Sequence, residues 1–307
     1  MPRCVEAGYP FRFFSLLLAS PASPMDYYGL EYNDFDTYSD RSFDLVEDHD
    51  TLNRKIARDI ADRVEAGNDA GRETTMILPV GPLDYTVLAD LCNEERIDLG
   101  SLRVYMMDEY MNKAGDAIPM DHPLSFRRYM HDTLVDPLDD DLGMSMEQVI
   151  FPDPGETDAL SEEIMEMGGV DVCYGGFGIT GHFAFNDPPE PGDTTTDLDD
   201  LRETRTRVVE ITRESVTQMV MGGSHGNWDI VPSQAVSLGM KELLASDEIH
   251  LTFMRAWHAG VLRRALFGPI SVGCPGSLLQ EHDRVEVTLT QAAAEPPVMH
   301  VAQDTGE

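Results

Sequence analysis

The stretch from Val170 to His182 reads VDVCYGGFGITGH, a short apolar run followed directly by a glycine turn. The first part has the length and composition of a strand that is buried on both faces. Glycines at 176, 178 and 181 let the backbone approach a ligand closely. His182 adds the side chain that titrates nearest neutral pH. The pattern predicts a strand of a parallel sheet that ends beside a binding site.

Similar segments recur on both sides of this stretch. Short apolar runs alternate with segments whose apolar residues have helical spacing, such as Ile56, Ile60 and Val64. This alternation predicts βαβ units in an α/β fold with three αβα layers and a mostly parallel, Rossmann-like sheet. The expected strands are 75–81, 102–107, 170–176, 206–211, 248–254 and 285–289. The expected helices are 52–66, 86–92, 125–134, 160–167, 234–244 and 258–267.

The 307 residues suffice for one large α/β domain, which we expect to span residues 45–290. Residues 1–44 are expected to be a poorly ordered extension, with Met25 opening the functional chain. Residues 291–307 are expected to be a disordered tail. The segment that begins at Pro188 is rich in Pro, Gly, Thr and Asp and has no core pattern. It predicts a lid near residues 188–205.

The composition narrows the choice of partners. The formal net charge is -34, from 56 acidic and 22 basic residues, so nucleic acid and anionic membranes are poor partners. Such an acidic surface suits both a protein that works at high salt and an acidic protein of an ordinary cytoplasm. The four cysteines are scattered without a C-x-x-C pair, and no apolar run reaches the roughly 20 residues of a membrane span. We expect a soluble protein without a metal site.

Several residues that suit a ligand site follow the expected strands. In open parallel sheets, ligands bind beyond the carboxyl ends of the strands. Gly81, Asp108, Gly178 and Arg255 all fall at such ends. The sequence therefore predicts one site that collects residues from four strands.

A resemblance to a known family is carried by the segment Gly181 to Pro188, which reads GHFAFNDP. It resembles the signature of the glucosamine-6-phosphate deaminases; the related 6-phosphogluconolactonases share its first half and differ after it. Three more segments resemble deaminase motifs in the same order: MDEY at 107–110, DHPLSF at 121–126 and TRTRV at 204–208. The likeness covers roughly residues 45 to 290.

The resemblance implies a reaction on a small sugar. In this family an open-chain amino sugar phosphate is isomerised from aldose to ketose with loss of ammonia, without a metal or redox cofactor. By motif match, Asp108 is the base for the C2 proton, His182 moves the ring-opening proton, and Asp187 orients the imidazole. The resemblance also implies a cytoplasmic homo-oligomer, such as a hexamer. The substrate-binding residues implied by the match are Gly81, Glu109, Gly178, Thr180, Gly181, Arg207 and His258.

Two departures from the family pattern concern the catalytic group. Thr180 stands where the family has an Asp, and Asp187 is one methylene shorter than the usual Glu. Loss of a carboxylate beside His182 is expected to weaken the support of this histidine as a base. Asp108 has a structural alternative as well, because an Asp after a strand can cap the next turn.

The remaining departures concern the phosphate. The family's first loop offers backbone N–H groups and hydroxyls, whereas Pro82 lacks an N–H group and Asp84 adds a negative charge. His258 aligns with the family's lysine, and Met221 lies near the position of a phosphate-binding arginine. Arg207 matches a residue tied to effector binding, but Val209 replaces its lysine partner. These positions predict an altered phosphate site and no regulatory one.

Three functions fit these observations. The first is an amino-sugar isomerase or deaminase with an altered phosphate site. The second is a 6-phosphogluconolactonase-like hydrolase, which needs only a base to activate water. The third is a non-catalytic sugar-binding regulatory protein on the same fold. Retention of Asp108, His182 and Asp187 together favours an enzyme.

Overall fold

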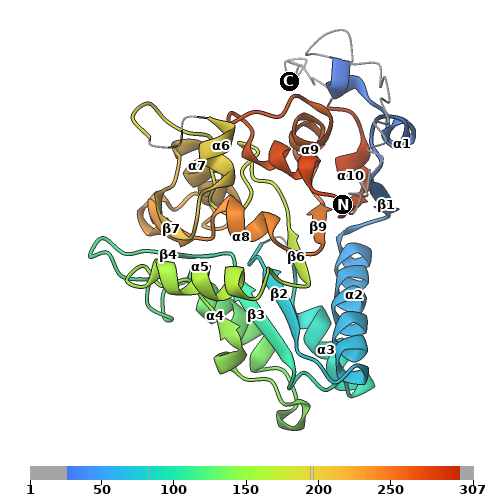
Figure 1. Cartoon of the computed structure of the whole chain (residues 1–307), viewed down its shortest axis with the longest axis vertical. Helices are drawn as coiled ribbons and strands as arrows, with labels where there is room; N and C mark the ends of the chain where they lie inside the picture. Colours follow the sequence, from blue (N-terminus) through green and yellow to red (C-terminus); the bar gives the residue numbers. More distant parts are fainter. Residues whose placement is uncertain (1–25, 82, 194, 196, 298–307) are drawn as a thin grey trace, which may run out of the picture.

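The computed structural model describes residues 26–297, except residues 82, 194 and 196. In these residues, seven parallel strands form one sheet in the order β1-β10-β9-β6-β2-β3-β5, and three strands form a small antiparallel sheet in the order β4-β8-β7 (Figure 1). The strands are β1 (Ser42–Val46), β2 (Thr74–Leu78), β3 (Leu102–Met106), β4 (Asp108–Tyr110), β5 (Val149–Ile150), β6 (Val172–Gly175), β7 (Arg207–Glu210), β8 (Gln234–Ser237), β9 (Ile249–Phe253) and β10 (Val285–Thr290).

Helices cover both faces of the large sheet. The α-helices are α1 (Phe35–Tyr38), α2 (His49–Asp69), α3 (Thr86–Glu95), α4 (Phe126–Met130), α5 (Thr157–Glu166), α6 (Leu198–Arg202), α7 (Arg213–Gly222), α8 (Met240–Leu244), α9 (His258–Phe267) and α10 (Gln291–Ala294). A π-helical turn, His131–Val135, continues α4. The longest of these helices, α2, is preceded by Asp48, whose carboxylate accepts a hydrogen bond from the Thr51 N–H and caps the first turn.

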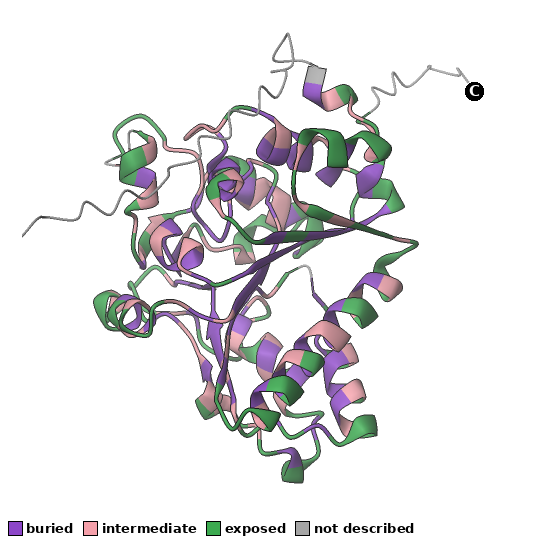
Figure 2. Cartoon of the chain, turned by 45° about the vertical axis from the view of Figure 1, so that its right-hand side comes forward, coloured by how far each residue is buried: buried purple, intermediate pink, exposed green. Residues whose placement is uncertain are grey.

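Two separate cores show that the sheet is the middle layer. On β2, Met76 and Leu78 pack into the core beneath α2 and α3, while Ile77 packs into the core beneath α5 and α9. This alternation follows from the pleat, which sends successive side chains to opposite faces. Figure 2 shows the strands as a buried layer between helices whose outer sides are exposed. The predicted three-layer α/β fold is confirmed.

The predicted helix at 234–244 is wrong in its first half. Residues Gln234–Ser237 form strand β8, which pairs antiparallel with β4 and β7, and the helix begins only at Met240. Ala235, Val236 and Ser237 are all buried, so the segment has no solvent-facing side that would reveal its period. A short run buried on both faces cannot be told from a buried helix by its pattern alone.

The domain extends beyond both predicted limits. Residues 26–44 were expected to be poorly ordered, but Phe35 is fully buried and packs against Phe43 and Phe267, and β1 forms an edge of the large sheet. Residues 291–297 were expected to be a disordered tail, but they include α10, with Ala293 buried. The aromatic contact of Phe35 with Phe267 holds α1 to α9. The rest of the predicted extension and tail, residues 1–25 and 298–307, lies outside the described residues.

The segment predicted to be a lid divides into two parts. The described residues from 188 to 197 contain no helix or strand. Residues Leu198–Arg202 form α6, and Leu201 is buried against the core beneath α5 and α9. The second half of the predicted lid is therefore part of the packed domain.

Across residues 26–297, with the three positions named above set aside, no helix has both the length and the apolar character needed to cross a membrane.

Candidate active site

A cavity of about 240 Å³ lies beyond the carboxyl ends of β2, β3, β6 and β9. The chain leaves β2 for β3 on one side and later returns to β6 on the other side, so the cavity lies where the strand order reverses, the usual ligand position in such sheets. The residues predicted from sequence that line it are Gly81, Asp108, Gly178, His182, Arg255 and His258.

Asp108 enters this cavity from β4, directly after the end of β3. Its side chain is 8% exposed, and no donor of the described residues hydrogen-bonds to its carboxylate. Burial, together with the negative charge of the adjacent Glu109, raises the pKa of Asp108 from 3.8 to about 8. A carboxylate with such a pKa is a much stronger base than an exposed one, which suits removal of a proton from carbon.

His182 is held in the cavity by the glycine turn that follows β6. A Cβ on Gly178 would lie 2.0 Å from the imidazole Nε2, so only glycine leaves room for the ring in this position. Gly181 has a φ of 84°, a left-handed conformation that glycine adopts without strain. The glycines predicted to contact substrate thus also place the histidine.

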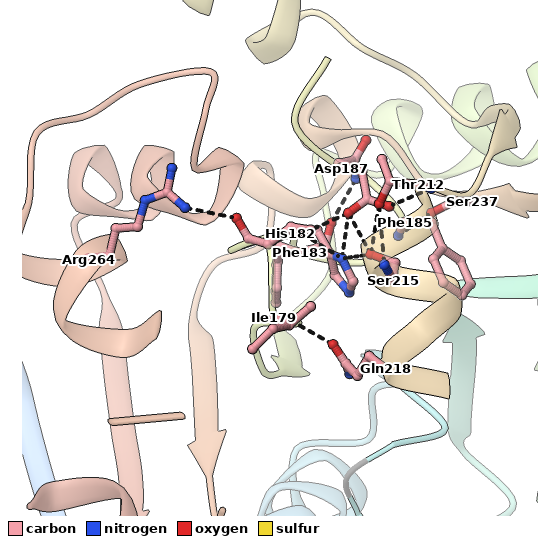
Figure 3. A network of polar contacts seen from close by, with 12 residues as sticks. Ile179, His182, Phe183, Phe185, Asp187, Thr212, Ser215, Gln218, Ser237 and Arg264 are labelled. Carbon is pink, nitrogen blue, oxygen red and sulfur yellow. Dashed lines mark hydrogen bonds and ion pairs between the residues drawn. The ribbon is translucent and has the colours of Figure 1, made fainter. Parts of the chain in front are cut away.

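Asp187 does not line the cavity but holds the imidazole of His182, which does, and Figure 3 shows the two side chains together. Its Oδ1 lies 2.8 Å from His182 Nδ1, and it also accepts hydrogen bonds from the hydroxyls of Thr180 at 2.7 Å and Ser215 at 2.8 Å. Burial opposes ionisation of this carboxyl group, but the hydrogen bonds from His182, Thr180 and Ser215 lower its pKa to about 2. Asp187 is therefore a carboxylate at neutral pH.

These bonds decide where the proton of His182 lies. Both hydroxyls donate to Asp187, so neither has a hydrogen left for Nδ1, and Nδ1 must carry the proton that it shares with the carboxylate. In the neutral ring, Nε2 is then free to accept a proton on the cavity side. The structure gives Thr180 a definite function here: its hydroxyl supports Asp187, where the family has a second carboxylate.

Replacing Thr180 by Val tests this hydroxyl. The variant keeps the shape of the side chain but removes one donor from a buried carboxylate, so we expect the free energy of unfolding at pH 7 to fall by about 1.5–3 kcal/mol. The loss should shrink as pH falls through about 2, where Asp187 becomes protonated. Urea unfolding at several pH values measures it. Thr133→Val, which loses only a bond to the Tyr129 carbonyl, is the control; an equal, pH-independent loss in both would contradict the assignment.

Glu109, predicted to bind substrate, does not reach the cavity. It follows Asp108 on β4, so the pleat turns its side chain to the opposite face, where it is fully buried. Its carboxylate accepts hydrogen bonds from the backbone N–H groups of Tyr110, Phe126 and Arg127. Burial raises the pKa of Glu109 in spite of these bonds. Its function is to hold the start of α4 against β4.

Arg207 is also outside the cavity. Its guanidinium donates to the Asn186 side chain at 2.9 Å and lines a separate hollow together with Pro189 and Asp193. The prediction that Arg207 binds substrate therefore does not hold for a substrate in this cavity. Asp187 and Thr180 likewise act behind His182 and do not line the cavity itself.

His258 lines the cavity but cannot replace a lysine. It is 4% exposed, and its Nδ1 accepts hydrogen bonds from the N–H groups of Met254 and Arg255, both at 3.1 Å. Burial and the nearby charge of Arg255 lower the pKa of His258 to about 3. The imidazole is neutral and shapes the loop after β9.

Helix α7 supplies wall residues that the sequence did not reveal. Gln218, Met219 and Gly222 of α7 line the cavity, and so does Gly223, which follows the helix. The Gln218 side chain accepts a hydrogen bond from the Ile179 N–H at 2.7 Å. Ser215, which supports Asp187, lies one turn earlier. The helix was missed because its buried residues are few and small, so its apolar period is weak.

Known proteins are similar to this chain over most of its length. No family model matches the chain. The glucosamine-6-phosphate deaminase of Rhodococcus opacus is 30% identical over 250 residues, 78% of this chain and 88% of that protein. The deaminase of Rhodopirellula baltica is 28% identical over 263 residues, 82% of this chain and 94% of that protein.

Two solved structures share the fold. A monomeric glucosamine-6-phosphate deaminase matches with a TM-score of 0.69 at 22% identity, covering 82% of this chain and 98% of that one. A 6-phosphogluconolactonase from Shewanella baltica matches with a TM-score of 0.58 at 17% identity, covering 81% and 97%. At these identities the structural likeness establishes the fold alone.

Proposed function

The chain belongs to the glucosamine-6-phosphate deaminase family, and on that premise we propose that it is an amino-sugar isomerase and deaminase with an altered phosphate site. The observation that carries the proposal is that Asp108 and His182 line one cavity from different strand ends. One is a buried carboxyl group with a raised pKa, and the other is a histidine whose free nitrogen faces the cavity. Such a pair suits a reaction with two separate proton transfers.

In the proposed reaction, His182 opens the sugar ring. Its Nε2 takes the proton of the anomeric hydroxyl and returns it to the ring oxygen, while the carboxylate of Asp187 stabilises the transient imidazolium. The Asp108 carboxylate then removes the C2 proton of the open aldose and returns it at C1. One amine proton moves to the C1 oxygen, so the C1 aldehyde becomes an alcohol and C2 becomes an imine. Water adds to this imine and ammonia leaves C2, which gives the ketose.

Replacement of His182 by Gln should separate the two proton transfers. Glutamine has no titrating nitrogen, so we expect turnover of a cyclic amino sugar to fall by about 10²-fold or more, with a much smaller loss for an open-chain amino sugar that cannot form a ring. Steady-state rates with the two substrates measure this ratio. His131→Gln removes a half-exposed imidazole elsewhere and serves as control. Equal losses on both substrates would sink the assignment to ring opening.

Four observations support an altered phosphate site. The Asp84 carboxylate accepts hydrogen bonds from the Thr86 N–H and hydroxyl, so the start of α3, which an anion could otherwise approach, already carries a carboxylate. His258 is neutral, and Met221 is exposed where the family pattern has an arginine nearby. Pro82 lies outside the described residues, but it lacks an N–H group in any conformation.

A substrate screen tests the function and the phosphate site together. Aldose, ketose and amino sugars and an aldonolactone, each with and without a 6-phosphate, are supplied while ammonia, ketose and acid are followed. We expect ammonia with an amino sugar, and calorimetry should show that the 6-phosphate of glucosamine raises its affinity by less than about a hundredfold. A larger gain in affinity would indicate a phosphate site like that of the family pattern. Acid release would indicate a lactonase-like hydrolase, and binding without turnover a regulatory protein.

The family resemblance is also the basis for proposing a cytoplasmic homo-oligomer. Large apolar side chains are exposed on the described surface, among them Met221 and Trp228, and such side chains favour association when they lie together at an interface. Light scattering at two protein concentrations measures the mass. A monomer at both, as in the monomeric deaminase with this fold, would contradict the proposal.

A further inference from the structure

A second cavity adjoins the first. It has a volume of about 960 Å³, and the two share Gln218, Gly222, Arg255 and Trp257 in their walls. It is therefore open to any part of a substrate that extends beyond the reacting carbons. Apolar side chains form much of its surface, including Ile179, Met221 and Trp257.

Two arginines line this second cavity. Arg264, on α9, is half-buried and donates hydrogen bonds to the backbone carbonyls of Gly273 at 2.5 Å and Thr180 at 3.5 Å. A guanidinium has five N–H donors, so these two contacts fix its position and leave donors for a ligand. Arg255 is exposed at the junction of the two cavities.

Arg255 and Arg264 differ from several other arginines of the chain in having no acidic partner among the described residues. Arg96 pairs with Asp139 and Asp141, and Arg202 pairs with Asp199 and Glu281. In the part of the chain that the structure describes, neither Arg255 nor Arg264 forms an ion pair with a carboxylate, although the chain has 56 acidic residues. A partly buried guanidinium without a counter-charge favours an incoming anion.

The opposite charges in this cavity come from other segments. Glu214 lies on α7, and Glu190 lies in the segment after the glycine turn. Figure 3 shows Arg264 on the other side of the turn at 179–182 from Ser215 and Gln218 of α7. An anion is therefore favoured on the α9 side, where Arg264 lies, and a hydroxyl or ammonium group on the α7 side.

We propose that the second cavity is a subsite for an anionic substituent of the sugar, held by Arg264 and Arg255 over an apolar wall. In the first cavity Arg255 is the sole charged cation among the described lining residues, because His258 is neutral. The two arginines therefore lie away from the first cavity's interior: Arg255 at the junction of the two cavities and Arg264 in the second one. The substrate class that fits is an amino sugar whose anion is carried on a longer, partly apolar arm than a 6-phosphate. This inference rests on the proposed function.

The test compares three ligands: glucosamine, glucosamine 6-phosphate and glucosamine esterified at O6 with succinate, which carries a carboxylate on a longer arm. Calorimetry with the wild type should show the succinate ester binding more tightly than the 6-phosphate. In Arg264→Met, the advantage of the succinate ester over glucosamine should fall about tenfold to a hundredfold. Arg213→Met removes an exposed guanidinium from α7 outside both cavities and should leave that advantage unchanged.

Arg255→Met is a second variant of the subsite that should fold normally, because this side chain is exposed and forms no hydrogen bond within the described residues. A wild type that prefers the 6-phosphate overturns the subsite, as does an unchanged advantage in both arginine variants. Ammonia and ketose release are followed in parallel. Absence of both in the wild type, with the binding pattern intact, would sink the proposed reaction while supporting the subsite.

Discussion

Asp108→Asn is expected to lower the rate of hydrogen exchange at C2 of the substrate by about 10²–10⁴-fold, with a much smaller change in affinity. Asparagine keeps the size of the side chain but cannot accept a proton. The residue is buried in the wall of the cavity, and no described donor holds its carboxylate, so the substitution breaks no hydrogen bond. The loss of deuterium from C2-deuterated glucosamine, followed by NMR, measures the rate.

Asp229→Asn is a matched control, because Asp229 is exposed and lies outside the cavity. Near-normal exchange in Asp108→Asn would exclude the residue as the C2 base.

The pH dependence of the wild-type reaction gives a second check. With a pKa of about 8, Asp108 is mostly protonated in the free protein at neutral pH, and only its carboxylate accepts the proton. The kcat/KM of the wild type should therefore rise about tenfold per unit up to about pH 8 and then level off.

The positions of the catalytic candidates were predictable because they follow strands. Buried parallel strands are short apolar runs, and a change to glycine or charge marks their ends, as at Met107–Asp108 and Gly175–Gly176. The carboxyl ends of such strands meet at one edge of the sheet. This rule predicted that Asp108, Gly178 and Arg255 lie at one site, and it needs no information about tertiary contacts.

The functions of the neighbouring side chains could not be predicted in the same way. The motif gave no sign that Asp108 and Glu109 belong to a short strand, whose pleat separates their side chains. Ser215 lies 28 residues beyond Asp187 in sequence, on a helix with a weak apolar period, so its contact with Asp187 depends on tertiary packing. His258 was aligned by position, whereas its two backbone contacts and its burial decide its charge.

The raised pKa of Asp108 has a consequence for stability. The pKa rises from 3.8 in an exposed carboxyl group to about 8 in the folded protein, a difference of about 4 units. Below about pH 4 the group is protonated in both states and costs nothing. Between about pH 4 and pH 8 the unfolded chain ionises while the folded one holds the proton, so the free energy of unfolding falls by about 1.4 kcal/mol per unit. Above about pH 8 the full cost, on the order of 5 kcal/mol, is present.

Asp108→Asn removes this cost, and the inactive variant should therefore be the more stable protein at alkaline pH. We expect its free energy of unfolding to exceed that of the wild type by a margin that widens by about 4 kcal/mol between pH 5 and pH 9, since about three of the four units lie in that range. Urea unfolding at the two pH values measures the margin, and Asp229→Asn should follow the wild type. A margin that is the same at both values would show that Asp108 ionises as easily in the folded chain as in the unfolded one. The buried carboxylate could then not be the strong base that proton removal from carbon requires.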